Sequence, residues 1–257
     1  MMNSAKAMQI VHENIEAHGG MVRWSNLDAL DAEISARGFL FMAKRRPILD
    51  HVRIHAETRE PRFSFFDFPK PGQTAELIGN DEVRIIDSES GAILSRRDKP
   101  RMFFTRFRRQ FKWDDLDFIY FAGYATWNYL IFPFMLTRKG FGIELLEPLP
   151  GKLSQFTRLQ VTFPDDIPTH SRKQVFYVDD QRLLRRLDYT AEVVGKWAHA
   201  AHLCESYKIF DGIKAPTKRR VLPLFVGHTP LPGPVLVEID VHDIRPVPSA
   251  PASVQAA

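Results

Sequence analysis

A long segment without formal charge includes Phe118 to Met135, and it limits what the other elements can form. Its apolar residues recur at helical spacing, and the remaining positions are apolar as well, so that no polar side is left. A helix that is apolar all round is enclosed either by protein or by lipid. Residues 113–135 are therefore predicted to form an aromatic helix that other elements cover.

The ends of this segment carry their own signals. Asp114, Asp115 and Asp117 lie where the first turn would be, and the helix dipole favours negative charge there. Pro133 should kink or end the helix. An uncharged run of about 18 residues is also the usual minimum for a membrane span. Asn128, Pro133 and the alternating sequences on both sides favour a helix enclosed by protein.

Alternation of apolar and polar residues on both sides of the helix predicts half-buried strands. Ala32, Ile34 and Ala36, for example, alternate with charged or hydroxyl side chains. Short turns rich in Gly, Pro, Asn and Asp separate the strands, so the sheet should be antiparallel. A first helix is expected over 4–17, and strands over 32–36, 52–56, 62–68, 74–78, 82–87, 92–95, 157–163, 174–178, 183–190, 199–210, 216–224 and 235–241.

This order of elements indicates the α+β class. One large curved antiparallel sheet would form an unclosed barrel, and helices, including a helical insertion at 101–140, would fill its concave face. Residues 1–247 are expected to form a single domain. Residues 248–257, rich in Pro, Ala and Ser, are expected to be a disordered tail.

Composition narrows the range of functions. The formal net charge of +4 is too small by itself to indicate a nucleic-acid-binding protein. A single cysteine, Cys204, excludes an internal disulfide framework and is typical of a reducing compartment. The N-terminal residues lack the continuous apolar core of a secretory signal, so we expect a cytoplasmic protein.

Three blocks of sequence carry a resemblance to a known family. QVFYVDDQRLLRRLDYTAEVVG at 174–195, the strand containing Tyr207, and DGIKAPTKRRV at 211–221 are similar to the β-rich half of proteins with the outer-membrane lipoprotein carrier (LolA/LolB-like) fold. HGGMVRWSNLDAL at 18–30 looks like a signature of uncharacterised bacterial proteins of this kind. The resemblance implies an unclosed β-barrel with helices in its opening. This chain departs from the carriers, which are periplasmic, in having no visible signal peptide and an unusually long aromatic insertion.

The resemblance also implies a ligand, because such carriers hold acyl chains in an aromatic-lined cavity. We therefore expect binding of an apolar small molecule, such as a lipid, acyl chain or terpenoid-like compound. Tyr and Trp can offer a hydrogen-bond donor from an otherwise apolar wall. Plain core packing explains the same aromatic pattern equally well. The predicted ligand-binding residues are Tyr120, Phe121, Tyr124, Trp127, Phe134 and Tyr177.

A cofactor-independent lyase, isomerase or cyclase that acts on an apolar substrate in the same cavity is the alternative. Its predicted catalytic residues are His202 and Tyr189, because a histidine in an apolar pocket can act near neutral pH when a phenol orients it. By strand alternation, Tyr189 should face inward and Asp188 outward, and His202 and Tyr207 should face opposite sides. Ordinary polar residues of the sheet are the simpler interpretation.

Other chemistry has little support in the sequence. His199, His202 and Cys204 lack the spacing of a zinc motif, and no metal or cofactor is expected. There is no GxGxxG, no P-loop and no nucleophile elbow. Asp165, Asp166 and His170 follow one another closely and could meet at a cavity rim.

The stretch from Arg96 to Lys112 holds eight cations and one acid, with phenylalanines between them. It could form a cationic amphipathic helix that makes a peripheral contact with an anionic membrane. A solvated basic face over buried rings is the favoured interpretation. Mixed aromatic and basic residues also occur in single-strand nucleic-acid sites, but no nucleic-acid-binding motif accompanies them here, so no nucleic-acid partner is expected.

Overall fold

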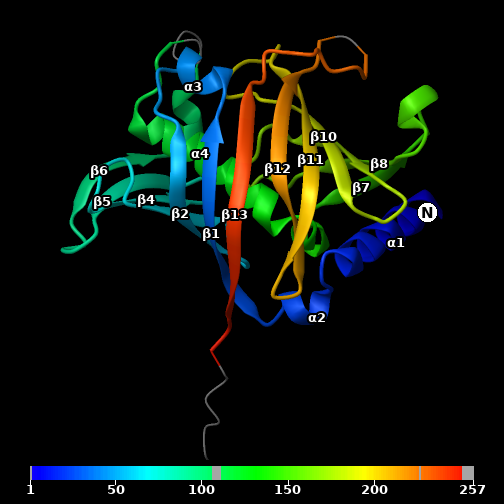
Figure 1. Cartoon of the computed structure of the whole chain (residues 1–257), viewed down its shortest axis with the longest axis horizontal. Coiled ribbons are helices and arrows are strands. Elements are labelled where there is room, and N and C mark those ends of the chain that lie inside the picture. The colour runs from blue at the N-terminus through cyan, green and yellow to red at the C-terminus, as the bar shows by residue number, and fades with distance from the viewer. Residues whose placement is uncertain (1, 106–110, 226, 251–257) are drawn as a thin grey trace, which may run out of the picture.

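The computed structural model describes residues 2–105, 111–225 and 227–250. Thirteen strands form one antiparallel sheet in the order β6-β5-β4-β3-β2-β1-β13-β12-β11-β10-β9-β8-β7. The sheet curves around its helices, and β6 and β7 are its two edges, so it is an unclosed barrel (Figure 1). The predicted α+β class is confirmed.

Chain order explains this topology. Strands β1 to β6 and β7 to β13 each pair with their sequence neighbours, and β1 pairs with β13 to join the two halves. The strands are β1 (Leu27–Arg37), β2 (Leu49–Glu57), β3 (Arg62–Phe66), β4 (Gln73–Ile78), β5 (Glu82–Asp87), β6 (Ile93–Asp98), β7 (Gly142–Leu146), β8 (Thr157–Thr162), β9 (Lys173–Val178), β10 (Leu184–Thr190), β11 (His199–Phe210), β12 (Ile213–Pro223) and β13 (Val237–Pro248).

The helices lie mainly between the two halves of the chain and at its start. They are α1 (Met2–Ala17), α2 (Met21–Trp24), α3 (Phe39–Ala43) and α4 (Asp115–Ile131), with short 3-10 turns η1 (Pro100–Phe103), η3 (Phe134–Thr137) and η4 (Gly151–Leu153). All the strands predicted from alternation are present. Strand β7 and helix α3 were not predicted, because each is only five residues long and has no distinct periodicity.

Several boundaries differ from the prediction, and two of them change how a segment is interpreted. Strand β6 continues to Asp98, into the stretch interpreted as a cationic helix, because its residues pair with β5 from Glu82 onward. Pro248 was assigned to the tail, but it ends β13 and pairs with Leu27 of β1. Residues 251–257 lie outside the described residues.

Helix α4 is the predicted aromatic helix, and it crosses the concave side of the sheet (Figure 1). Asp114 accepts a hydrogen bond from the Asp117 backbone N–H, and the Asp117 carboxylate accepts one from the Asp114 N–H. This capping box satisfies two donors that the first turn leaves free. Gly123 allows close approach to β4, since a Cβ there would lie 3.3 Å from Leu77 side-chain atoms.

Helix α1 covers the other end of the concave side, next to β7. Ala7, Val11 and Ile15 form its buried line and join the same core as α4. The Asn3 side chain donates to the Leu145 carbonyl of β7, and Asn14 donates to the Arg182 carbonyl. Within the described ranges, no helix is both long enough and apolar enough to cross a membrane.

Replacing Trp127 by alanine should lower the free energy of unfolding by about 3–5 kcal/mol, the usual cost of truncating a buried tryptophan. Trp127 is fully buried, and its Nε1 donates to the Glu57 carbonyl at 2.9 Å. Urea denaturation measures the change. Trp197→Ala is the matched control, because that side chain is 69% exposed and its loss should change stability by about 0.5 kcal/mol or less. Equal effects of the two substitutions on the free energy of unfolding would contradict the prediction that burial of Trp127 stabilises the fold.

Candidate functional site

The three predicted binding residues on one face of α4 all contact protein groups. Tyr120, Tyr124 and Trp127 are each 0% exposed. The Tyr120 hydroxyl donates to Asn80 Oδ1 at 3.2 Å, and the Tyr124 hydroxyl lies 3.1 Å from His170 Nδ1. Trp127 Nε1 donates to the Glu57 carbonyl of β2, so the polar side-chain atom of each of these three residues has a protein partner. The packing is that of a core.

Phe121 and Phe134 extend the same aromatic packing. Phe121 is half-buried, and its ring centre lies 5.1 Å from that of Trp113. Phe134 is buried, and its ring stacks on Trp24 with the centres 4.0 Å apart. Phe121 therefore packs α4 against the segment before it, and Phe134 packs η3 against α2.

Tyr177, by contrast, lies on the opposite face of the sheet from α4, so its inclusion in a set with the α4 residues was wrong. Its neighbour Phe176 faces inward and stacks on Phe132 of the concave side, and successive strand residues face opposite ways. The Tyr177 hydroxyl donates to Asp188 Oδ2 at 2.8 Å on the convex side. Burial, together with the Asp188 charge, raises the pKa of Tyr177 to about 12.

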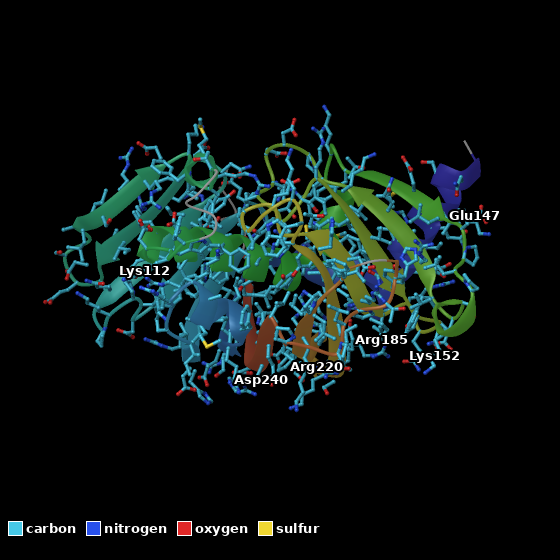
Figure 2. All side chains as sticks on the ribbon, turned by 90° about the horizontal axis from the view of Figure 1, so that it is seen from above. Lys112, Glu147, Lys152, Arg185, Arg220 and Asp240 are labelled. Carbon is cyan, nitrogen blue, oxygen red and sulfur yellow. The ribbon has the colours of Figure 1, made fainter. Side chains whose placement is uncertain are left out.

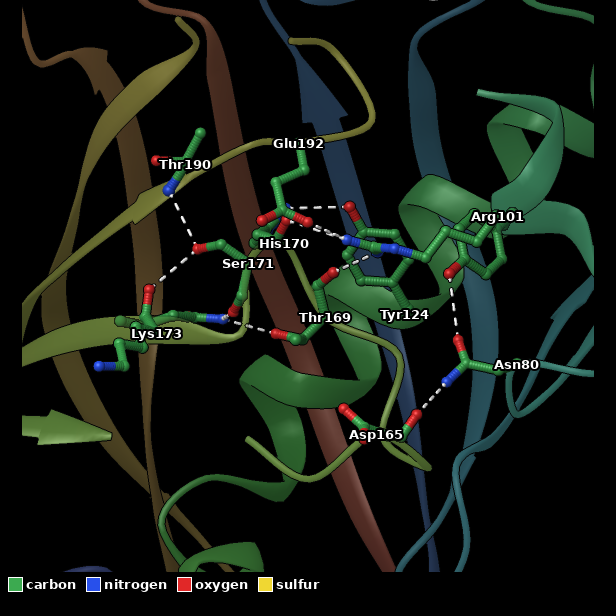
Figure 3. A network of polar contacts seen from close by, with 12 residues as sticks. Asn80, Arg101, Tyr124, Asp165, Thr169, His170, Ser171, Lys173, Thr190 and Glu192 are labelled. Atoms are coloured by element: carbon green, nitrogen blue, oxygen red, sulfur yellow. Dashed lines mark hydrogen bonds and ion pairs between the residues drawn. The ribbon is translucent and has the colours of Figure 1, made fainter. Parts of the chain in front are cut away.

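His170 is the centre of a buried polar network between α4 and β10 (Figure 3). Its Nε2 lies 2.7 Å from the Tyr129 hydroxyl, its Nδ1 bonds Tyr124, and its ring stacks on Tyr189 with the centres 4.0 Å apart. Burial lowers the pKa of His170 to about 3, so the ring is neutral at physiological pH. A neutral imidazole donates from one nitrogen and accepts at the other, so one tyrosine donates to it and one accepts from it.

Arg101 fixes the loop that carries His170 (Figure 3). Its guanidinium donates to the Thr169 carbonyl at 2.7 Å and to Glu192 Oε2 at 2.6 Å. The predicted meeting of His170 with Asp165 and Asp166 does not occur. His170 is buried, whereas both aspartates are exposed.

The two predicted catalytic residues, His202 and Tyr189, share the concave face, but no hydrogen bond joins them. Their ring centres are 6.4 Å apart. His202 is 0% exposed, and neither ring nitrogen has a hydrogen-bond partner among the described residues. Burial, assisted by the charge of Arg219, holds the pKa of His202 well below its ordinary value.

Tyr207 faces the same side as His202, so the predicted opposition of these two residues was wrong. Ser206, between them in sequence, has a φ of 55°, and this left-handed conformation breaks the alternation of the strand. Tyr207 consequently packs on His18, with ring centres 5.8 Å apart. Both line an internal cavity of about 10 Å³.

Arg219 also lines this small cavity. It is buried and donates to Cys204 Sγ at 3.3 Å and to the Tyr129 carbonyl at 2.9 Å. Burial raises the pKa of the Cys204 thiol. Among the described residues, no group of three or more His, Cys, Asp and Glu side chains could hold a metal ion.

The basic stretch forms no amphipathic helix in its described part. Arg96 and Arg97 lie in β6, and residues 100–103 form a 3-10 turn; 106–110 lie outside the described residues. Arg97 bonds Asp114 and Asp117 at 2.6 and 2.7 Å. The other described cations up to Arg101 also form ion pairs, namely Arg96 with Glu82 and Asp98, Lys99 with Asp81, and Arg101 with Glu192.

A space suited to a small molecule lies elsewhere, between α1 and the ends of β7 and β8. This cleft of about 500 Å³ is within the range of about 300–1,000 Å³ typical of ligand sites. Ile10, Leu145, Leu146 and Phe156 supply apolar walls, and Arg158 lines it as well. Sequence reasoning missed the cleft, because it forms from the start of the chain and a distant hairpin end that share no motif.

Acidification should destabilise the fold through its buried neutral histidines. Burial lowers the pKa of His18 to about 4 and that of His170 to about 3, against about 6.5 for an unfolded chain. Below about pH 6.5 the unfolded chain therefore binds more protons than the folded one. As the pH is lowered, the free energy of unfolding therefore decreases by up to about 1.4 kcal/mol per pH unit for each histidine.

Urea denaturation at pH values from 7.5 down to 4.5 measures this slope. His170→Gln should make it shallower, whereas His12→Gln, at an exposed position of α1, should leave it unchanged. A slope that is the same in all three proteins would contradict the assignment to His170.

Comparison with known proteins supports the fold. No family model matches the sequence, and no curated protein matches it. Two solved structures are similar over almost the whole chain. A LolA superfamily protein from Nitrosomonas europaea is 13% identical, with a TM-score of 0.52, and the match covers 98% of this chain and 97% of that one.

The second is a putative outer membrane lipoprotein-sorting protein domain from Vibrio parahaemolyticus. It is 12% identical, with a TM-score of 0.52, and the match covers 99% of this chain and 95% of that one. At such low identity the likeness concerns the fold alone. The resemblance predicted from the sequence is confirmed at that level: the chain has a LolA-like fold.

Proposed function

We propose that this protein binds an amphipathic or apolar small molecule, such as a lipid, an acyl chain or a terpenoid-like compound, in the cleft between α1 and the β7–β8 end of the sheet. The cleft itself is the observation that carries the proposal. It combines a volume suited to a small ligand with a few apolar side chains, and polar and charged residues make up the larger part of its lining.

The apolar walls of the cleft come from α1, from the end of β7 and from the segment before β8. Ile10 on α1 is buried in the core, and Leu145 and Leu146 at the end of β7 are half-buried. Phe156, just before β8, is half-buried and forms an edge contact with Tyr177, with ring centres 6.3 Å apart. A ligand that covers these partly exposed apolar groups gains the free energy of removing them from water.

The concave side, by comparison, is closely packed. The aromatic side chains of α4 are packed against protein, and the nearby internal cavity of about 10 Å³ holds no more than a water molecule. Neither His202 nor Tyr189 lines the cleft. Binding without a chemical step is therefore the function that we propose for the cleft.

Filling the cleft should abolish binding without unfolding the protein. Leu146→Trp places a larger ring on a half-buried wall position and should weaken binding of the apolar fluorescent probe N-phenyl-1-naphthylamine at least tenfold. Ile93→Trp is the matched control, because it adds the same ring at a partly exposed position on the other edge strand, β6. Titrations that show the same affinity in Leu146→Trp and in the unmodified protein would rule out this cleft.

A further inference from the structure

Arg158 is a buried cation in the cleft with few partners. The residue is 9% exposed and is among those that line the space between α1 and the β7–β8 end. A guanidinium carries five N–H donors. Among the described residues, the one hydrogen bond of Arg158 runs from Nη1 to the Glu147 carbonyl at 2.8 Å, and its buried Nε has no partner.

The neighbouring buried charges do not neutralise it. Arg186 donates to both oxygens of Asp188, at 2.6 and 2.9 Å, so this carboxylate already has a guanidinium partner. The Tyr177 ring lies between the two arginines, 4.8 Å from the Arg186 guanidinium carbon and 5.6 Å from that of Arg158. The Asp188 carboxylate thus pairs with Arg186 alone, and no described carboxylate lies within 4.0 Å of Arg158. Leaving a buried charge without a counter-ion is costly.

The remaining charges of the cleft leave a positive balance. Its walls carry three cations, Lys6, Arg158 and Arg182, and two carboxylates, Glu13 and Glu147. Glu13 already pairs with Arg182 at 2.6 Å. Figure 2 shows Glu147 at the end of the molecule opposite Lys112, so Lys112 lies far from this end of the cleft.

We infer that the ligand of this cleft carries an anionic group, a carboxylate or a phosphate, and that Arg158 binds it. The inference rests on the proposed function and specifies its ligand as an anionic amphiphile, with its apolar part against Leu145, Leu146 and Phe156. The planar fork of a guanidinium matches both anions and can give each of them two parallel hydrogen bonds. Such a group supplies the counter-ion and the acceptors that Arg158 lacks.

The experiment measures displacement of bound N-phenyl-1-naphthylamine from the full chain by three ligands with the same alkyl chain: dodecanoate, dodecyl phosphate and dodecanol. In the unmodified protein at least one anion should displace the probe at a roughly tenfold lower concentration than dodecanol. Arg158→Gln should weaken that anion roughly tenfold to a hundredfold, the usual range for a lost charged hydrogen bond, and leave dodecanol unchanged. The tighter of the two anions identifies the headgroup.

Two further variants separate binding from folding. Arg245→Gln removes an exposed arginine of β13 that lies outside the cleft, and it should retain the preference for the anion. Arg158→Lys keeps the charge but loses the fork, so it should bind the anion several-fold more weakly than arginine does. If Arg158→Gln fails to fold, the lysine variant and the selectivity of the unmodified protein decide the question.

Each outcome has one meaning. An unmodified protein that binds the probe but does not prefer either anion overturns the inference and leaves the proposed function intact. The same holds if Arg158→Gln folds and keeps the preference, because Arg158 would then serve only to cover the Tyr177 ring. A protein that binds neither the probe nor any of the three ligands would overturn the proposed function itself.

Discussion

The structure depends on enclosing a helix that has no polar side. From Phe118 to Met135 the chain carries no formal charge, and fifteen of the seventeen residues of α4 are buried. A flat sheet would cover only one side of such a helix. The thirteen strands curve around it instead, and α1 and the loops complete the enclosure (Figure 1). Burial of apolar surface on all sides of α4 is the main favourable term for this arrangement.

The enclosure also has to satisfy the polar atoms that the aromatic residues bring with them. A buried hydroxyl without a partner costs free energy, so the hydroxyls of Tyr120, Tyr124 and Tyr129 each reach a group from another part of the chain. His170 serves two of them at once, and this fixes how α4 lies against the loop after β8. His202 departs from the rule, because both of its ring nitrogens lack partners among the described residues.

The fold could be predicted further than the site. The alternation of strand residues and the long aromatic segment are strong periodic signals, and both led to the observed elements. The orientation of single residues was less secure. Tyr207 faces inward because Ser206 adopts a left-handed conformation, and no adjacent glycine in the sequence predicts it. Tyr177 faces outward because the register of β9 places its neighbour Phe176 inside. The cleft depends on two segments more than a hundred residues apart, so no local pattern could reveal it.

The charged residues of β6 have a consequence for how the molecule behaves among its own copies. An unclosed sheet has two edges whose backbone groups can accept a strand from another molecule. At the β7 edge, α1 lies alongside, and the Asn3 side chain donates a hydrogen bond to the Leu145 carbonyl. At the β6 edge, Ile93 and Leu94 are about half exposed and would favour such pairing, but Arg96, Arg97 and Asp98 follow directly. Charged side chains on an edge strand oppose the approach of a second sheet. The start of the basic stretch thus protects an open barrel against edge-to-edge aggregation.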